Sequence, residues 1–82
     1  MRVQVKLYAS LRRYRSEVAL GQTFVCDVPD DCTVGQLALE TLQLPPEEVA
    51  ITLVNGVYQT RDYEFNDGDR IALWPPIAGG LL

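Results

Sequence analysis

Hydrophobic and polar residues alternate along several stretches of the chain, and this alternation is the period of a strand with one buried face. In the first stretch, residues 2–8, Val3, Val5 and Leu7 fall on one face and polar residues on the other. The same pattern predicts strands over residues 23–28, 51–54 and 70–74, with a short return strand at residues 57–58. We expect the first two strands to pair antiparallel.

Turn-forming residues separate the later strands. Asn55-Gly56 is the strongest short hairpin signal in the chain, because both residues tolerate positive φ. A second turn at residues 66–69, made of Asn, Asp and Gly, leads into the last strand. In that strand Ile71 and Leu73 share one face, and Trp74 lies on the opposite face.

The main helix is predicted to begin after Thr33, because Thr33 and Gln36 have the spacing of a capping box. The apolar stripe that would face the sheet consists of Val34, Leu37, Ala38, Thr41 and Leu42. Pro45-Pro46 would stop the helix within a turn of this stripe. A shorter helix is predicted within residues 9–20, and a single helical turn within residues 46–50.

These elements predict an α+β domain in which one main helix packs on one mixed sheet. A chain of 82 residues has room for a single small core. The side chains expected to be buried in it are Val5, Leu7, Leu37, Leu42, Ile71 and Leu73.

Composition and charge narrow the classes of partner. Seven basic and eleven acidic residues give a formal net charge of −4, which argues against a nucleic-acid ligand. No run approaches the roughly 18 apolar residues of a membrane span, and the N-terminus lacks the apolar segment of a signal peptide. We therefore expect a cytoplasmic protein that does not bind membranes.

The chain offers little chemistry of its own. It contains no histidine and only two cysteines, Cys26 and Cys32, too few ligands for a structural zinc site, and no bound cofactor is expected. Cys26 is expected in the core. Cys32 precedes a helix N-terminus, which favours a thiolate, but Asp30 and Asp31 oppose it, so Cys32 is interpreted as structural or incidental. We therefore expect a substrate of enzymes and not an enzyme. The arginines at positions 12, 13 and 15 are either a solvated face or a docking patch.

The most distinctive stretch is the run that follows the last strand, Trp74-Pro75-Pro76-Ile77-Ala78-Gly79-Gly80, with Leu81-Leu82 after it. The two prolines remove backbone donors, so the ladder cannot continue and the chain leaves the sheet extended. Gly79 and Gly80 carry no side chain, so the backbone there can enter a narrow tunnel in another protein.

At these residues the chain resembles the ThiS/MoaD family of ubiquitin-like sulfur carriers. The resemblance is densest in "NDGDRIALWPPIAGG" and weaker in "VKLYASLRRY" and "CTVGQLALETL". It implies a ubiquitin-like β-grasp fold over residues 1–76, with the first and last strands as a central parallel pair, and a flexible tail over residues 77–82.

The resemblance also implies a function for the tail. In the family an E1-like adenylating enzyme uses ATP to activate the terminal glycine, and a sulfur donor then converts it to a thiocarboxylate. Gly80, preceded by Gly79, occupies that position here. The Pro-Pro before the tail is most similar to the small subunit of molybdopterin synthase, so the expected acceptor is a synthase subunit of molybdenum or tungsten cofactor biosynthesis.

In the family, the apolar surface at the tail exit docks both the activating enzyme and the sulfur acceptor. The residues of this chain expected to contact partners are Tyr8, Trp74, Pro75, Pro76, Ile77 and Ala78.

Leu81-Leu82 depart from the family pattern, in which the chain stops at the second glycine. Some relatives carry a short extension that a protease removes, and the same processing is expected here. Two other interpretations remain open. One is a ubiquitin-like modifier conjugated to lysines through Gly80, and the other is an interaction module in which the two leucines permanently block the glycine.

Overall fold

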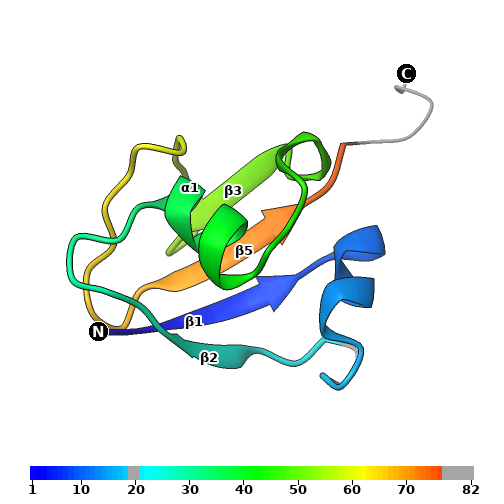
Figure 1. Cartoon of the computed structure of the whole chain (residues 1–82), viewed down its shortest axis with the longest axis horizontal. Helices are drawn as coiled ribbons and strands as arrows, with labels where there is room; N and C mark the ends of the chain where they lie inside the picture. The colour runs from blue at the N-terminus through cyan, green and yellow to red at the C-terminus, as the bar shows by residue number, and fades with distance from the viewer. Residues whose placement is uncertain (19–20, 77–82) are drawn as a thin grey trace.

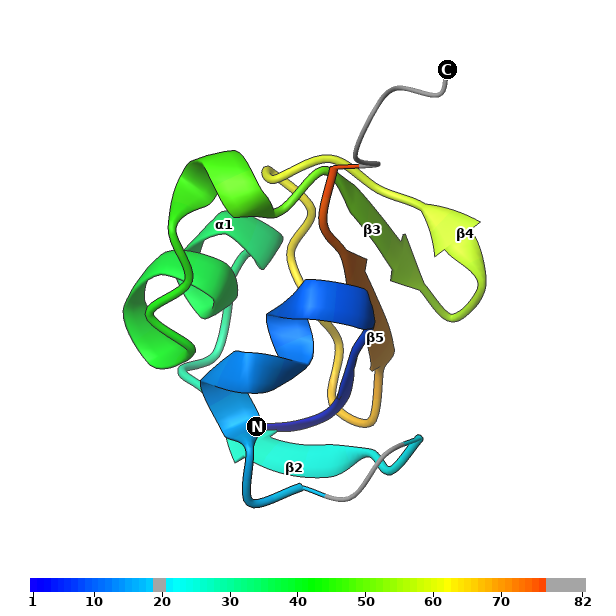
Figure 2. The same cartoon turned by 90° about the vertical axis from the view of Figure 1, so that its right-hand side faces the viewer.

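The computed structural model describes residues 1–18 and 21–76 (Figure 1). The elements in chain order are β1 (Arg2–Leu7), η1 (Ala9–Arg15), β2 (Phe24–Asp27), α1 (Val34–Gln36), η2 (Leu37–Thr41), η3 (Pro46–Glu48), β3 (Ile51–Val54), β4 (Val57–Tyr58) and β5 (Arg70–Trp74). The α+β class predicted from the pattern is confirmed, since one mixed sheet of five strands carries the main helix on one face (Figures 1 and 2).

The first and last strands lie side by side in the middle of the sheet. The strand order is β2-β1-β5-β3-β4, and β1 and β5 run parallel, with Val5 level with Ile71. β2 pairs antiparallel with β1, β3 pairs antiparallel with β5, and β4 at the far edge pairs antiparallel with β3. Because β1 and β5 are parallel, their carboxyl ends lie at the same edge of the sheet. Tyr8 and the exit of β5 therefore lie together.

The predicted capping box opens the main helix. The hydroxyl of Thr33 accepts the Gln36 N–H at 3.2 Å, and the Gln36 side-chain oxygen accepts the Thr33 N–H at 2.9 Å. These two bonds satisfy backbone donors that the first turn of a helix leaves unpaired. Removing the Thr33 hydroxyl would leave the Gln36 N–H unpaired, and removing the Gln36 side chain would leave the Thr33 N–H unpaired.

The helix widens after one α turn. In η2 the Leu42 N–H donates to the Leu37 carbonyl at 2.9 Å, which is the spacing of a π turn. The predicted stripe still faces the sheet, with Thr41 as its only half-buried member. The helix ends before Pro45-Pro46, because Gln43 takes a positive φ of 56° and reverses the chain first.

The helix predicted within residues 9–20 is shorter than expected. It is a 3₁₀ helix, η1, that ends at Arg15, and such helices rarely run beyond a few residues because their hydrogen bonds are strained. Leu11 is fully buried and anchors it to the sheet. Ala9, its first residue, has a φ of 52°, a left-handed conformation in which a Cβ is crowded. Residues 19–20 lie outside the described part of the chain.

The predicted Asn55-Gly56 hairpin is tied to the start of β5. Asn55 and Gly56 both have positive φ, 52° and 84°. The Asn55 side chain donates to the Asp69 carboxylate at 2.9 Å and accepts the Arg70 N–H at 3.0 Å. Asp69 is buried and also accepts the Asn66 N–H at 2.8 Å. This network fixes the β3–β4 hairpin against the central strand.

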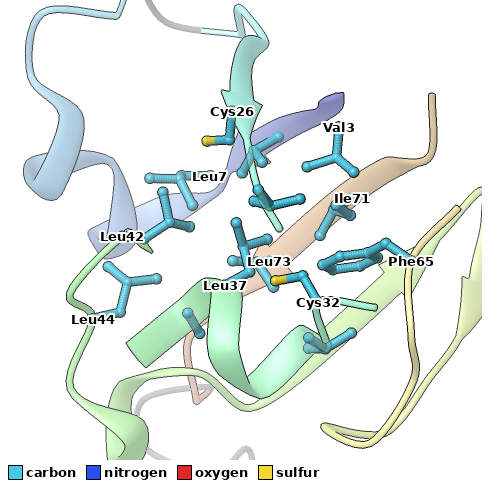
Figure 3. Close-up of a cluster of buried hydrophobic side chains, with 14 of the residues drawn as sticks. Val3, Leu7, Cys26, Cys32, Leu37, Leu42, Leu44, Phe65, Ile71 and Leu73 are labelled. Carbon is cyan, nitrogen blue, oxygen red and sulfur yellow. The ribbon is translucent and has the colours of Figure 1, made fainter. Parts of the chain in front are cut away.

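The core lies between the inner face of the sheet and the helix. Figure 3 shows side chains of β1 and β5 directed toward those of η2 and the segment after it. All six residues predicted to be buried are buried, the most exposed being Leu7 at 7%. The core also contains Cys26, Cys32, Leu44 and Phe65.

Candidate functional site

The candidate site lies where β5 ends. Trp74 is its last residue, and its carbonyl accepts the Ala50 N–H at 2.9 Å before Pro75 and Pro76 lead the chain away. The prediction that the strand stops at the prolines is confirmed. Residues 77–82 lie outside the described part of the chain, and with them lie the predicted tail over residues 77–82 and the predicted contacts and reactive residues Ile77, Ala78, Gly79, Gly80, Leu81 and Leu82.

Two aromatic rings stack beside this exit. The rings of Tyr8 and Trp74 have centroids 4.1 Å apart and an interplanar angle of 12°. The parallel pairing of β1 and β5 produces this contact, since the Tyr8 N–H donates to the Leu73 carbonyl at 3.1 Å. The ammonium of Lys6 lies 5.1 Å from the centroid of the Tyr8 ring. The start of the tail is therefore held by a stack and not by a single side chain.

Two hollows open on the outer face of the sheet, on either side of a ridge formed by Leu53 and Trp74. The larger, of about 460 Å³, includes Lys6, Ala72 and Arg70. The smaller, of about 310 Å³, lies toward the tail and is lined by Ile51, Leu53, Tyr58, Trp74 and Pro75. Three of the five side chains of the smaller hollow are aliphatic and two are aromatic. It can accept an apolar side chain of a partner.

The structure brings together three of the predicted contact residues. Tyr8, Trp74 and Pro75 surround the exit, and each is half-buried; Pro76 follows as an exposed residue. The alternation in β5 is confirmed, because Ile71 and Leu73 are buried while Trp74 remains on the outer face.

The sequence pattern did not indicate that the neighbouring strands contribute to the site. Ile51, Leu53 and Tyr58 line the smaller hollow because β3 pairs with both β5 and β4, placing Leu53 level with Tyr58 and Ile51 level with Trp74. The Asn55-Gly56 hairpin already implied that β3 pairs with β4. The pairing of β3 with β5 depends on the order of the strands in the sheet, which the alternation of hydrophobic and polar residues does not reveal.

The cysteines are not part of the site. Both thiols are buried in the core, as expected for Cys26. Burial raises the pKa of the Cys26 thiol, and burial together with Glu40 and Asp31 raises the pKa of Cys32. Both therefore favour the unreactive thiol form. Within residues 1–18 and 21–76, no three His, Cys, Asp or Glu side chains gather as metal ligands.

The arginines of η1 act largely within the fold. Arg13 donates to Glu48 at 2.7 Å, and Arg15 donates to the Thr41 carbonyl at 3.3 Å. These contacts join η1 to η2 and η3. Arg13 and Arg15 therefore tether η1 within the fold, which neither of the two interpretations, a solvated face or a docking patch, had included. Arg12 is exposed.

In the described part of the chain, no helix is both long enough and apolar enough to cross a bilayer.

Comparisons with known proteins agree with this geometry. The family model described as Mut7-C ubiquitin matches residues 1–79. No curated protein sequence matches significantly.

Among solved structures, SAMP1 from Haloferax volcanii is 28% identical, with 98% of this chain and 100% of that chain covered and a TM-score of 0.63. A putative molybdopterin converting factor subunit 1 from Pyrococcus furiosus is 24% identical, with 93% and 98% covered and a TM-score of 0.69. A complex of subunits 1 and 2 of the molybdopterin-converting factor from Helicobacter pylori matches at 20% identity, with 98% and 100% covered and a TM-score of 0.58.

These likenesses confirm the ubiquitin-like β-grasp fold implied by the resemblance. The resemblance to the ThiS/MoaD family agrees with them, since by name these structures include a small archaeal modifier protein and a molybdopterin converting factor subunit. The family match covers all but the last three residues. The chain therefore belongs to the Mut7-C ubiquitin family.

Proposed function

We propose that the protein is a sulfur carrier whose reactive atom is the carboxyl carbon of Gly80. The observation that carries this proposal is the position of the Gly-Gly sequence. In the sequence it follows by a few residues the central strand β5 of a β-grasp sheet, which ends at Trp74, stacked on Tyr8. The family match over residues 1–79 supports it.

The chemistry takes place on the tail and is supplied by a partner. A free carboxylate is a poor electrophile. The Gly80 carboxylate therefore first attacks the α-phosphorus of ATP, which releases pyrophosphate and leaves an acyl-adenylate. A sulfur nucleophile then adds to the carbonyl carbon and displaces AMP, so that a thiocarboxylate replaces the carboxylate. An E1-like enzyme supplies the ATP site, and this chain supplies the acyl group.

The chain's own contribution is to present the glycine. Trp74 is fixed by the stack with Tyr8, and Pro75-Pro76 hold φ near −65°, so the direction in which the tail starts is set by the domain. Gly79 and Gly80 leave the carbonyl open on both faces, since neither has a Cβ. A folded domain followed by a segment without bulky side chains suits a substrate that must enter another protein's active site.

The residues after Gly80 must be removed before this chemistry. In the full chain the terminal carboxylate belongs to Leu82, displaced from Gly80 by roughly 7 Å along an extended backbone. We propose that a protease cleaves after Gly80.

The test uses a chain that ends at Gly80, the cognate E1-like enzyme, ATP and a sulfide donor. Intact-mass analysis should detect replacement of one oxygen by sulfur in this chain and not in the full chain. Gly80→Ala in the same shortened chain is the matched control, and its new methyl should slow the reaction by crowding the carbonyl. Equal adenylation of the full and shortened chains would contradict the processing step. Failure of both chains with every E1-like enzyme of the source cell would contradict the carrier function.

A second candidate function is protein modification through Gly80. The likeness to SAMP1 favours it, because SAMP1 belongs to the small archaeal modifier proteins by name. Both functions begin with the acyl-adenylate, and they differ in the nucleophile that follows. Isopeptide-linked conjugates in the source cell would identify the modifier, whereas a thiocarboxylate without conjugates would identify the carrier.

The acceptor of the sulfur follows from the same resemblance. The Helicobacter pylori relative is seen with subunit 2 of its molybdopterin-converting factor. We propose that this chain delivers sulfur to a subunit of that kind during molybdenum or tungsten cofactor biosynthesis in the cytoplasm. Loss of the cofactor in a deletion strain, restored by the wild-type gene and not by a gene encoding Gly80→Ala, is the expected result.

A further inference from the structure

The smaller hollow is an apolar site that the described residues leave open. It lies between β3, β4 and the end of β5 (Figure 2), and its volume is about 310 Å³. Ile51 and Leu53 on its floor are only half-buried. Tyr58 on its rim is 74% exposed, since β4 is an edge strand with no described neighbour beyond it. Apolar side chains left in water beside a pocket are typical of a surface that another segment covers.

One wall of this hollow is the start of the tail itself. Pro75 lines the hollow, and the carbonyl of Trp74, one residue earlier, is held by the Ala50 N–H at 2.9 Å. Residues 77–82 follow and lie outside the described part of the chain. Six residues in extended form reach about 20 Å. Because the tail begins at the rim of the hollow, its length does not prevent its last residues from returning there.

The sequence of the tail favours such a return. Gly79-Gly80 is one of the two-residue sequences preferred in a tight hairpin turn, because both positions of that turn require positive φ. A turn there would bring Leu82 level with Ile77, which is two residues, or roughly 7 Å, beyond Pro75. The two residues on either side of the glycines are all apolar. Both arms of the turn would therefore offer only apolar side chains to the sheet.

We propose that Leu81-Leu82 fold back on the same chain and occupy the smaller hollow, with Gly79-Gly80 as the turn. The leucines would then cover Trp74 and Tyr58 and hold the glycines in a bent conformation. An active site that takes Gly80 at the end of an extended tail would not accept this closed form. Removal of the two leucines would therefore open the tail as well as expose the Gly80 carboxylate.

This contact deepens the proposed function, on which it rests only for the purpose of opening the tail. The contact itself needs neither ATP nor sulfur. It also gives a reason for the apolar character of Leu81 and Leu82. Any two residues after Gly80 would displace its carboxylate equally well, whereas only apolar side chains would be stabilised in an apolar hollow.

The competing occupant of the hollow is the tail of a second copy, which carries the same two leucines. The tail of the same chain is favoured because it begins at Pro75, on the rim of the hollow. A short connection gives its leucines a higher effective concentration at the hollow than those of a second chain in dilute solution. A contact within one chain does not depend on protein concentration, whereas exchange of tails between copies does.

The first experiment compares the full chain with a chain that ends at Gly80. Trp74 is the only tryptophan of the chain and lines the hollow, so its fluorescence reports on the occupant. Acrylamide should quench Trp74 about twofold less efficiently in the full chain, since the leucines shield the ring in a closed form that predominates. In the full chain the methyl groups of Leu81 and Leu82 should also show nuclear Overhauser contacts with the Tyr58 ring. Equal quenching of the two chains, without such contacts, would overturn the proposal.

A full-length chain with Leu81→Ser and Leu82→Ser is the matched control for this comparison. It keeps the length of the tail and removes its apolar side chains. Its Trp74 should be quenched as efficiently as that of the chain ending at Gly80. Quenching as weak as in the wild-type full chain would mean that tail length and not the leucines protects Trp74, and it would overturn the proposal.

Variants of β4 test the contact from the side of the hollow. Tyr58→Ser removes one wall, so the difference in quenching between the full chain and the chain ending at Gly80 should disappear. Val57→Ser is the matched control, because Val57 is the preceding residue, is also exposed, and lines neither hollow. It should preserve the difference. A difference that survives Tyr58→Ser, or that both variants abolish, would overturn the smaller hollow as the binding site.

A mixture of isotopically labelled and unlabelled full chains distinguishes one chain from two. Overhauser contacts between Leu81-Leu82 and Tyr58 should be found only within a chain, and quenching of Trp74 should not depend on protein concentration. Contacts between labelled and unlabelled copies would overturn the proposal in favour of a dimer that exchanges tails.

The two proposals fail separately. A thiocarboxylate on the chain ending at Gly80, with no contact between Leu81-Leu82 and the hollow in the full chain, would remove the folded-back tail and leave the carrier function. A folded-back tail, with no activation of Gly80 by any E1-like enzyme, would confirm the contact and remove the carrier function.

Discussion

The inner and outer faces of β5 differ in the physical reason for their apolar residues. On the inner face, Ile71 and Leu73 are 2% and 0% exposed and pack against the helix. On the outer face, Ala72 and Trp74 stay half-buried although both are apolar. The inner face is determined by the stability of the domain, because apolar surface is removed from water there. The outer face retains apolar surface that folding does not cover, so its residues are better explained by a partner.

The same contrast holds across the whole sheet. Four large apolar side chains of the described residues are exposed, and three of them lie on strands: Val25, Val57 and Tyr58. Val25 and Tyr58 lie on the outer face, whereas Val57 lies level with the buried Val54 on the helix side, to which Leu39 also belongs. The buried core therefore lies on the helix side of the sheet, and the outer face keeps Val25 and Tyr58 exposed.

The largest expected effect is the loss of an inner-face side chain. Leu73→Ala should lower the free energy of unfolding by about 2–5 kcal/mol, because it removes buried methyl groups and leaves a cavity between β5 and the helix. Urea denaturation followed by circular dichroism measures this. A loss below about 1 kcal/mol would mean that the core collapses around the gap, and the contrast between the faces would weaken.

Trp74→Ala, at the next residue on the opposite face, should act mainly on binding. It removes the stack with Tyr8, so the free energy of unfolding should fall by roughly 1 kcal/mol. Affinity for the E1-like enzyme should fall by about 2 kcal/mol or more, as for an interface anchor. Calorimetric titration measures the affinity, and thermal denaturation measures the stability, so the two effects can be separated.

Val25→Ala is the matched control for this variant, because Val25 is exposed on the same face but lines neither hollow. It should change neither quantity appreciably. A large stability loss for Trp74→Ala with unchanged affinity would make Trp74 a core residue.

Ala9→Gly should stabilise the domain by up to about 1 kcal/mol. Ala9 lies where β1 turns into η1, with a φ of 52° that crowds its Cβ, and glycine adopts this conformation without that cost. The matched control is Ser10→Gly, at the next position, which has no positive φ and should lose stability. If both variants lose stability, the strain at Ala9 is smaller than the entropy that glycine adds to the unfolded chain.

The smallest effect concerns the two thiols of the inner face. Their pKa values are raised in the folded state, so the folded chain keeps these protons to higher pH than the unfolded chain. Stability from this source is complete below the ordinary thiol pKa, about 8.5, and is lost as pH rises through the raised folded pKa. The free energy of unfolding of wild-type protein should therefore fall more steeply above that pH than that of the Cys26→Ala/Cys32→Ala variant. Parallel curves would place the thiols in contact with water.

Much of the fold could be predicted from local pattern. The alternation in β1 and β5, the capping box at Thr33 and Gln36, and the Asn55-Gly56 hairpin are properties of neighbouring residues. Each of these features is confirmed. The hydrophobic pattern did not predict where the helices end, because the backbone conformation of single residues decides that. The helix after β1 ends at Arg15, and Gln43, whose φ is positive, reverses the chain before the prolines.

The candidate site divides in the same way. Trp74, Pro75 and Pro76 could be identified from the sequence, because a strand ending in two prolines before two glycines is a local signal. Tyr8 could be added only through the family resemblance, which implied that β1 and β5 are neighbours. The smaller hollow could not be predicted, since it depends on β3 pairing with β5 and on which face each strand turns outward.

By itself, the sequence determined the elements and the buried face of each strand, because both follow from residue type and spacing over a few positions. Only the tertiary structure decided that Tyr8 would stack on Trp74, that Leu53 would separate two hollows, and that Lys6 and Arg70 would border one of them. Those residues are separated by tens of positions in the chain. Their contacts come from the order and direction of strands, which are set by the burial of the whole sheet against the helix.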